Sequence, residues 1–404
     1  MLRGFLYIVS ADFIVRSAYQ VGKTPLLPIF AASLGATGAF LGFIVSVSTL
    51  TGMVLKPLIG VLSDRWGQRI WLIVGTMFFI GVPFFYRFVH TPEELFTIRL
   101  IHGLATAIYG PVTLAYVAAQ SEHRRAERLG WFTMARNAGY IIGPATAGGL
   151  LLVMSPVSIF TVVGLLSCLA MVPVLLLPES KQSLPPTRIT FRDHFTQALI
   201  VGIKTPSVWL AGSLEASIYM SLYALKTFLP INALASGVNV GLIGVFFAVQ
   251  GATHMLLSPL GGKISDRIGY SRGIAIGMLL QAIALFVLSM GPIGLMLLMS
   301  GALLGASQAL VLPSTIALVS RTVGGANVAT GMGLVGSLRN GGKVAGPTLV
   351  GALIVWLGFS QSLQLMGWAL MLGALVVSMG SFFSRQLMPK TDPLKGNSRS
   401  TAKE

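Results

Sequence analysis

The chain has 404 residues, of which 54% are hydrophobic and only 10% charged, and its mean hydropathy is +0.80. An ordinary soluble domain carries about 25% charged residues, so this composition excludes one and indicates a polytopic membrane protein. The net charge of +16 does not require a nucleic-acid partner, because the basic residues follow a pattern that membrane insertion explains.

Twelve apolar segments are expected to cross the bilayer. About 20 apolar residues span roughly 30 Å of hydrocarbon as a helix, and the chain has room for about twelve such helices joined by short turns. We therefore predict an all-α membrane protein with twelve transmembrane helices in two pseudo-symmetric six-helix bundles. In chain order, the expected helices cover residues 5–32, 39–63, 70–89, 95–119, 129–152, 157–178, 206–234, 240–262, 273–291, 294–319, 328–356 and 361–384.

Alternate loops between these segments differ in charge. No Lys or Arg occurs near residues 33–38, 90–94, 153–156, 235–239, 291–293 and 357–360, whereas the other loops are basic. Because cytoplasmic loops of membrane proteins are enriched in Lys and Arg, we expect both termini in the cytoplasm. The expected location is the cell membrane, with the chain as a multi-pass protein.

The chain contains an internal repeat. A charged loop at residues 60–69 recurs at 262–272, and several other positions match at a constant offset of 202 or 203 residues. A constant offset over many positions indicates a duplicated architecture, as in transporters built from two similar halves. We expect an N-terminal bundle at 1–178, a cytoplasmic linker at 179–205, a C-terminal bundle at 206–384 and a cytoplasmic tail at 385–404.

Three motifs resemble those of the major facilitator superfamily. The loop at 60–69 is similar to the motif between its second and third helices, and Arg99-x2-His102-Gly103 is similar to its fourth-helix motif, which usually has Gln where His102 stands. The resemblance covers nearly the whole chain and implies secondary transport by alternating access. The fifth-helix motif associated with proton-driven drug exporters is similar to the segment containing Gly139, Gly143, Pro144, Gly148 and Gly149. The motifs are closest to the twelve-helix drug/proton antiporter branch.

The resemblance implies that the charged loops act as a conformational latch. Glycines permit the turn, Asp64 can lie at a helix N-terminus, and the arginines can pair with carboxylates or carbonyls. Such contacts would hold the cytoplasmic ends of the halves together in the outward-facing state. The alternative is a plain positive-inside anchor. The expected latch residues are Gly60, Asp64, Arg65, Gly67 and Arg69, with Gly262, Asp266, Arg267 and Gly269 in the second copy.

The glycine-proline segment at 139–149 predicts a bent helix that packs closely on its neighbours. Small residues four apart allow backbones to approach, and Pro144 removes one helical hydrogen bond. This suits a moving interface. Because a similar pattern recurs at 342–351, symmetric packing without any bearing on the direction of transport is the alternative.

Two carboxylates lie deep within the predicted helices. Asp12 and Glu215 occupy equivalent positions, 203 residues apart, in the first helix of each half, and Lys23 and Lys226 follow each of them by eleven residues. Ionisable groups in the membrane are costly, so they are functional candidates. Asp12 can be neutralised locally by Arg16, four residues on. Glu215 has no basic residue four positions away, which makes it the better candidate for a carboxylate that gains and loses a proton.

The intramembrane basic residues outnumber these two acids. Unpaired buried cations are costly, so their excess favours an anionic or partly anionic cargo. The candidates for the substrate cavity are Arg16, Lys23, Lys226, Arg136, Arg339 and Lys343. The arginines have a structural alternative, since they can pair with helix ends or loop carbonyls.

These patterns together favour a secondary active transporter. We expect proton-coupled export of a small organic or amphipathic solute, with a carrier of organic anions or lysolipid-like substrates as the alternative and a non-transporting receptor as a third reading. The sequence has no nucleotide-binding GxxxxGK[ST] motif and no metal-ligand spacing, so neither an enzyme nor a cofactor is expected. The expected partners are protons, the small-molecule substrate and the lipid bilayer, with the chain as a monomer.

Overall fold

The computed structural model describes residues 2–119, 125–178, 200, 205–291, 294–323 and 328–387, and every regular element in this part of the chain is a helix. The helices of the first half are α1 (Leu2–Lys23), α2 (Leu26–Ser33), α3 (Gly38–Trp66), α4 (Gln68–Phe85), the 3-10 helix η1 (Tyr86–Phe88), α5 (Pro92–Ala119), α6 (Arg125–Leu150), α7 (Pro156–Cys168) and α8 (Met171–Leu175). Those of the second half are α10 (Pro206–Ala235), α11 (Val240–Ile268), α12 (Tyr270–Ser289), α13 (Gly294–Thr322), α14 (Val328–Leu357) and α15 (Phe359–Leu387).

Each of the twelve predicted spans coincides with helix, and the all-α prediction is confirmed. Two spans that were expected to be continuous are interrupted. The first divides into α1 and α2 at Pro25, and the sixth into α7 and α8 shortly before Pro173. Proline cannot donate a backbone hydrogen bond, and its ring clashes with the carbonyl four residues earlier, so an uninterrupted helix is disfavoured at both places.

Eight helices of the described residues are long and apolar enough to cross a membrane by composition alone. The remaining long helices are α1, α6, α10 and α14, which carry the intramembrane acids and most of the intramembrane cations. In the order of the repeat they are the first and fifth helices of each half. The ionisable residues of these four helices therefore indicate that they are inner helices, where charge is shielded from lipid.

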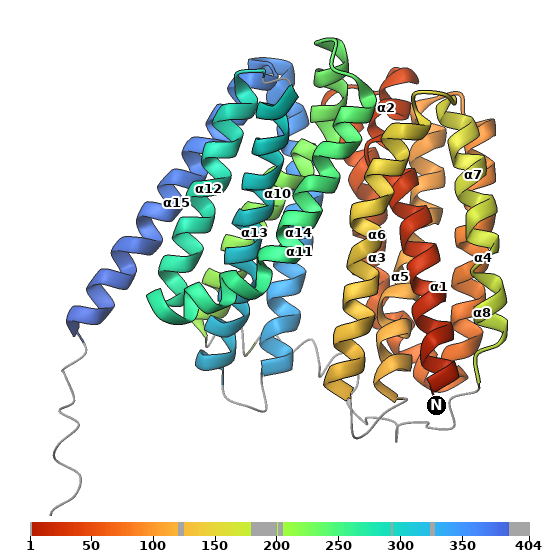
Figure 1. Ribbon diagram of the computed structural model, residues 1–404, viewed down its shortest axis with the longest axis horizontal. Helices are drawn as coiled ribbons and strands as arrows, with labels where there is room; N and C mark the ends of the chain where they lie inside the picture. Colours follow the sequence, from red (N-terminus) through yellow and green to blue (C-terminus); the bar gives the residue numbers. More distant parts are fainter. Residues whose placement is uncertain are drawn as a thin grey trace, which may run out of the picture.

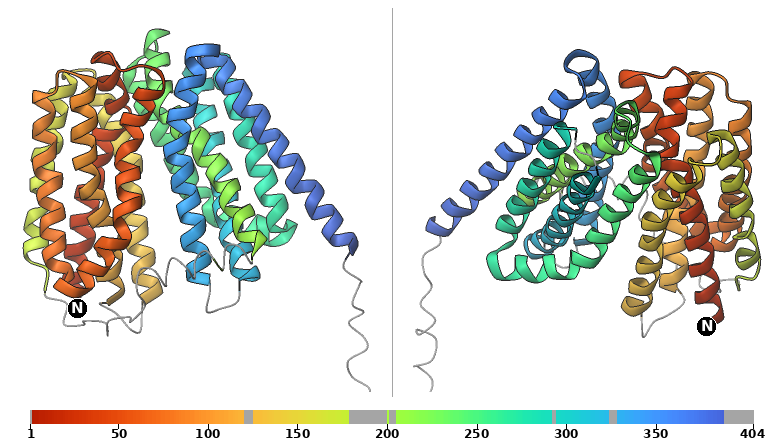
Figure 2. Two further views of the ribbon diagram at one scale, coloured as in Figure 1. Left: turned by 180° about the vertical axis from the view of Figure 1, so that it is seen from behind. Right: turned by 45° about the horizontal axis from the view of Figure 1, so that its top comes forward.

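The helices form two groups that meet along one seam. Figure 1 shows α1 to α8 in one bundle and α10 to α15 in the other, with contact near the end away from the N-terminus and divergence toward the end that holds it. Both views in Figure 2 show the same separation. The linker expected at 179–205 lies outside the described residues apart from Ile200 and Thr205, and so does the tail beyond residue 387.

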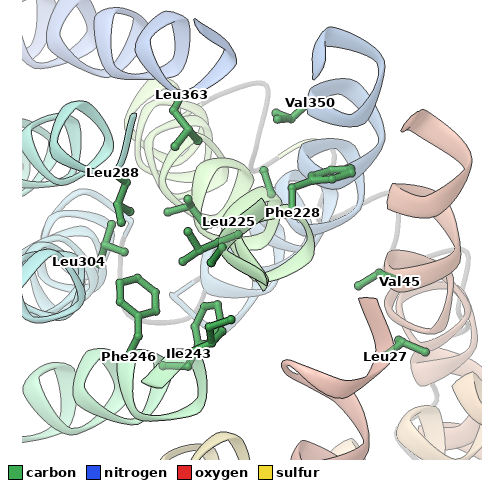
Figure 3. Packing of buried hydrophobic residues seen from close by; sticks show 14 of the residues in the cluster. Leu27, Val45, Leu225, Phe228, Ile243, Phe246, Leu288, Leu304, Val350 and Leu363 are labelled. Atoms are coloured by element: carbon green, nitrogen blue, oxygen red, sulfur yellow. The ribbon is translucent and has the colours of Figure 1, made fainter. Parts of the chain in front are cut away.

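The seam is formed by α3 against α14 and by α6 against α11. Glycines bring the backbones together there, since a Cβ atom at Gly42 would overlap the carbonyl oxygen of Pro347 and one at Gly244 would overlap that of Pro144. One buried hydrophobic cluster continues across the seam and includes Leu27, Val45, Phe228 and Val350 (Figure 3). Close backbone packing and this shared apolar core hold the bundles together at this end.

Gly42→Ala is expected to destabilise the seam. The added methyl group would clash with the Pro347 carbonyl, at a cost of about 1–3 kcal/mol. The bundles should then leave the arrangement of Figure 1, which spin labels at Ile70 and Lys263 in a Cys168→Ser background would report as a changed distance distribution. Gly81→Ala is the control, because no atom lies within 4 Å of a Cβ at that position. An unchanged distribution for Gly42→Ala would contradict the close packing.

Candidate functional site

Asp12 on α1 is held by an arginine from α6. The Arg136 Nε atom lies 2.9 Å from Asp12 Oδ2 and its Nη2 atom 2.8 Å from Oδ1, so the guanidinium donates two parallel hydrogen bonds. Arg136 also donates to the Thr113 hydroxyl on α5 at 2.8 Å. Only 1% of the Asp12 side chain is exposed. Bidentate pairing of this kind is the strongest arrangement for a buried carboxylate.

The expected local partner of Asp12 is secondary. The closest approach of Arg16 to Asp12 is 3.9 Å, against 2.8 Å for Arg136. Arg16 lies on the same helix as Asp12 and approaches one carboxylate oxygen from the side. Arg136 approaches from the facing helix and donates to both oxygens. The local pair predicted for Asp12 is present at this longer distance, and a closer pair between helices is added to it.

Glu215 on α10 has an equivalent but looser environment. The Arg339 Nη1 atom on α14 lies 3.5 Å from Glu215 Oε2, and the Thr315 hydroxyl on α13 donates a hydrogen bond to Oε1. Within the described residues, Oε2 accepts no hydrogen bond. The Arg339 side chain is 34% exposed, twice the 16% of Arg136, while Glu215 is 1% exposed. Glu215 has no basic residue four positions away on its own helix, as the sequence shows, and its basic partner comes from another helix.

The two triads are related by the internal repeat. The carboxylates and the arginines are each 203 residues apart, and the threonines are 202 apart. The threonines were not identified from the sequence, although the same offset relates them and could have found them. The duplicated groups are Asp12, Arg136 and Thr113 in one half and Glu215, Arg339 and Thr315 in the other. Each half thus buries one neutralised carboxylate between its first, fourth and fifth helices.

Three lysines surround one tyrosine ring where α1, α10 and α14 approach one another. The Lys23, Lys226 and Lys343 Nζ atoms lie 5.3, 5.4 and 5.6 Å from the centroid of Tyr223, so any two of them are within about 11 Å. Lys343 also lies 4.7 Å from the ring of Tyr219. Lys23 belongs to the first bundle and the other residues to the second. The cluster therefore joins the halves, and it contains three of the predicted substrate-cavity residues.

Each half has a cation–π contact between its first and fifth helices, but the cation and the ring exchange helices. Arg16 on α1 lies 5.9 Å from the Tyr140 ring on α6. At the equivalent positions of the second half, the ring is Tyr219 on α10 and the cation is Lys343 on α14. The contact is kept while the cation changes helix. This exchange places Lys343 next to Tyr223 and leaves position 219, four residues after Glu215, without a charge.

The fourth-helix motif lies inside the first bundle. Arg99 is fully buried and donates to the Tyr86 hydroxyl at 3.4 Å and to the Ser48 hydroxyl at 2.5 Å. The His102 Nδ1 atom lies 3.2 Å from the same Tyr86 hydroxyl. A Cβ at Gly103 would press against Thr51 of α3. These contacts place the motif in the packing between α3, η1 and α5. Tyr19 of α1 connects it to the lysine cluster, since its ring lies 5.1 Å from that of His102 and 5.6 Å from Lys23 Nζ.

The charged loops form no ion pair between the two bundles within the described residues. The side chain of Asp64 lies outside the described residues, and Arg65, Asp266 and Arg267 are exposed. Arg69 donates to the Leu175 carbonyl at 2.7 Å, within its own half, and Asp266 accepts from Tyr270 at 3.1 Å. Gly60 and Gly262 lie near the ends of α3 and α11. The turn that follows uses positive φ angles of 89° at Gly67 and 99° at Gly269, which favour glycine.

The fifth-helix motif packs on two neighbours. A Cβ at Gly139 would press on Ser17 and one at Gly143 on Gln20, both on α1, whereas Gly148 lies against Gly244 of the other bundle. Pro144 lies inside α6, and no atom lies within 4 Å of a Cβ at Gly149. On α14 the equivalent glycines Gly342, Gly346 and Gly351 pack in the same way against Ala216, Met220 and Gly38. Both halves thus use these glycines for close packing.

Comparison with known proteins identifies the family. The model for the Major Facilitator Superfamily matches the chain twice, over residues 20–214 and 211–403, which together cover nearly all of it. The boundary between the matches falls at the start of the second half. The same family model therefore matches each half of the chain.

The similar proteins are transporters and a resistance protein. An uncharacterized MFS-type transporter of Methanocaldococcus jannaschii is 25% identical over 345 residues, which cover 83% of this chain and 88% of that protein. The quinolone resistance protein NorA of Staphylococcus aureus is 28% identical over 232 residues, which cover 54% of this chain and 58% of NorA. The crystal structure of the nucleoside transporter NupG has a TM-score of 0.81 at 15% identity and covers 94% of this chain and 99% of its own. At that identity the likeness concerns the fold.

Asp12→Asn is expected to destabilise the protein more than Glu215→Gln. Breaking a buried pair leaves an uncompensated guanidinium and costs about 3–5 kcal/mol, and the cost falls when the cation is more exposed, as Arg339 is. The midpoint of thermal unfolding in detergent measures the order. Glu93→Gln, at an exposed carboxylate, is the control. Equal losses from the two substitutions would refute the difference between the triads.

Proposed function

The chain belongs to the Major Facilitator Superfamily and is a multi-pass membrane protein that acts as a secondary transporter, and on this premise we propose that it exports a small amphipathic organic solute in exchange for protons. The observation that supports coupling most directly is the buried carboxylate of each half, which an arginine from a second helix neutralises. The proposed location is the cell membrane, with both termini in the cytoplasm.

Glu215 is the proposed proton carrier, with Asp12 in a supporting role. Its carboxylate has one hydrogen bond from Thr315 and a 3.5 Å approach of Arg339, whereas Asp12 has a bidentate partner and a second arginine nearby. A carboxylate beside a cation stays ionised, and one that loses the cation in apolar surroundings takes up a proton. A small displacement of Arg339, or its engagement by substrate, is thus enough to change the protonation of Glu215.

The proposed cycle alternates about the seam between the bundles. The bundles touch at the end away from the N-terminus and diverge at the other, which we assign to a state open toward the cytoplasm. In the outward-facing state the diverged ends meet instead. The charged loops lie at those ends, so the latch contacts expected from Asp64, Arg65 and Arg69 belong to that opposite state.

The direction of transport rests on resemblance. The fifth-helix motif is similar to that of proton-driven exporters, and NorA, a protein of quinolone resistance, is among the similar sequences. Export of an amphipathic solute is the function that these similarities support.

A second candidate is a proton-coupled carrier of organic anions or lysolipid-like molecules. It is favoured by the cluster of Lys23, Lys226 and Lys343, which is paired with neither buried carboxylate. Arg16, Arg136 and Arg339 are also proposed to border the cavity, although the last two are engaged by the acids. We further propose that the units are the bundles 1–178 and 206–384, the linker 179–205 and the tail 385–404, and that one chain acts as a monomer.

Glu215→Gln should abolish proton-driven transport and leave solute binding detectable. The amide keeps the shape of the side chain and cannot exchange a proton. Flux is measured in proteoliposomes with an imposed pH gradient, using cationic dyes, organic anions and lysolipids as test solutes, and Glu93→Gln serves as the control at an exposed carboxylate. Undiminished gradient-driven flux in the Glu215 variant would remove the coupling assignment.

Asp64→Asn should slow the cycle without changing the choice of solute. If the carboxylate completes a latch in the outward-facing state, its loss lowers the population of that state. Labelling of cysteines introduced at the two ends of the cavity, from each side of the membrane, measures the population, with Lys263→Gln as the control at an exposed residue of the second loop. A plain anchor would leave the labelling pattern as in the parent protein.

A further inference from the structure

The charges of the central region do not balance by pairing. Both buried acids are engaged by arginines, Asp12 by Arg136 and Glu215 by Arg339. Within the described residues, no salt bridge involves Lys23, Lys226 or Lys343. Among the residues that the structure describes, the one hydrogen bond donated by these amines runs from Lys343 Nζ to Asn340 Oδ1, at 3.1 Å. Among the described residues, three amines therefore share one region without a salt bridge to a protein carboxylate.

Their position makes this imbalance costly. Lys23 is only 9% exposed, although it is a long charged side chain, and it interacts electrostatically with both Lys226 and Lys343. Tyrosine rings offset part of the cost through cation–π attraction. They cannot remove the mutual repulsion of three amines. Groups held in such an arrangement are complementary to a ligand of opposite charge.

We propose that Lys23, Lys226 and Lys343 bind one carboxylate or phosphate group of an aromatic organic anion beside the Tyr223 ring. The proposal rests on the transport function above and names the class of solute. Tyr223 lies close to Tyr19, Tyr140 and Tyr219, so the surroundings of the amines are aromatic rather than aliphatic. A flat ring attached to the anionic group would stack among them, as aromatic pairs do.

The site is completed only by both bundles. Lys23 comes from α1, and Lys226, Lys343 and Tyr223 come from the second bundle, so a bound anion joins the halves by charge-assisted hydrogen bonds. In its absence, repulsion between Lys23 and the other two amines acts across the same gap. Binding of the anion therefore favours closer approach of α1 and α10, and the solute itself helps to drive the conformational change.

The test measures binding at equilibrium, without a proton gradient. Purified full-length protein in nanodiscs is titrated with phenyl phosphate, benzoate, inorganic phosphate and tetraphenylphosphonium in an isothermal calorimeter. Lys23→Gln, Lys226→Gln and Lys343→Gln should each weaken phenyl phosphate by about tenfold or more, since each removes one charged hydrogen bond. Lys263→Gln, at an exposed lysine of α11, should leave the affinity unchanged. Tyr223→Leu should weaken phenyl phosphate more than inorganic phosphate.

Further measurements distinguish a lipid headgroup from a soluble anion, and a loss of binding from a loss of folding. Lysophosphatidate in place of phenyl phosphate distinguishes a lipid headgroup from a soluble anion, and tighter binding of it assigns the same site to a lysolipid. Each Lys→Gln change should raise the unfolding midpoint of the ligand-free protein, because repulsion is relieved, whereas a lysine needed for folding would lower it. The matching Lys→Arg variants should keep most of the affinity.

Some results would overturn the proposal. One is the absence of saturable binding of any anion. Another is a loss of phenyl phosphate affinity in Lys263→Gln equal to that in the three lysine variants. A third is tetraphenylphosphonium binding that depends on the three lysines. Glu215→Gln should retain anion binding while losing proton-driven flux. Failure of the anion site and failure of the coupling assignment are thus measured separately.

Discussion

A carboxylate in the membrane interior must be neutralised by the protein, and this requirement organises the centre of the molecule. In each half it is met by an arginine from the fifth helix, so α1 is tied to α6 and α10 to α14. Because arginines pair with both acids, the lysines of the same region remain without a salt bridge among the described residues. The arrangement of the acids thus underlies both the proposed proton carrier and the proposed anion site.

The two fifth helices also connect the site to the seam. On α6, Arg136 and Gly139 face α1, and one turn beyond Pro144 the helix packs through Gly148 against α11 of the other bundle. On α14 the same sequence of contacts leads from Arg339 to Gly351 against α3. A movement of the part of either helix that carries the arginine therefore also shifts the part that contacts the other bundle. Glycine is required there because any side chain would separate the backbones.

The sequence predicts the helices through their hydropathy. It also predicts the equivalence of Asp12 and Glu215, because a constant offset relates the two halves. The partners of the acids do not follow in this way. Spacing along one helix suggests Arg16 for Asp12, but a bidentate pair needs a guanidinium that approaches from a facing helix, and only the packing of α1 on α6 shows that Arg136 does so. Thr113 and Thr315 carried no signal of their own, because threonine is common in apolar helices.

The breaks at Pro25 and before Pro173 could be suspected from the prolines, although prolines elsewhere, such as Pro144, lie within intact helices.

One exchange of residues between the halves accounts for the difference between the two acids. In the first half, the cation of the cation–π pair is Arg16, which also lies 3.9 Å from Asp12 and adds a second positive charge to that acid. In the second half, the tyrosine occupies this position as Tyr219, and the cation has moved to α14 as Lys343. Arg339, 34% exposed, is then the salt-bridge partner of Glu215 within the described residues, while Tyr223 gains a third amine beside its ring. The same substitution that loosens the proposed proton carrier completes the proposed anion site, so duplication followed by this exchange is enough to turn two equal packing motifs into two different functional groups.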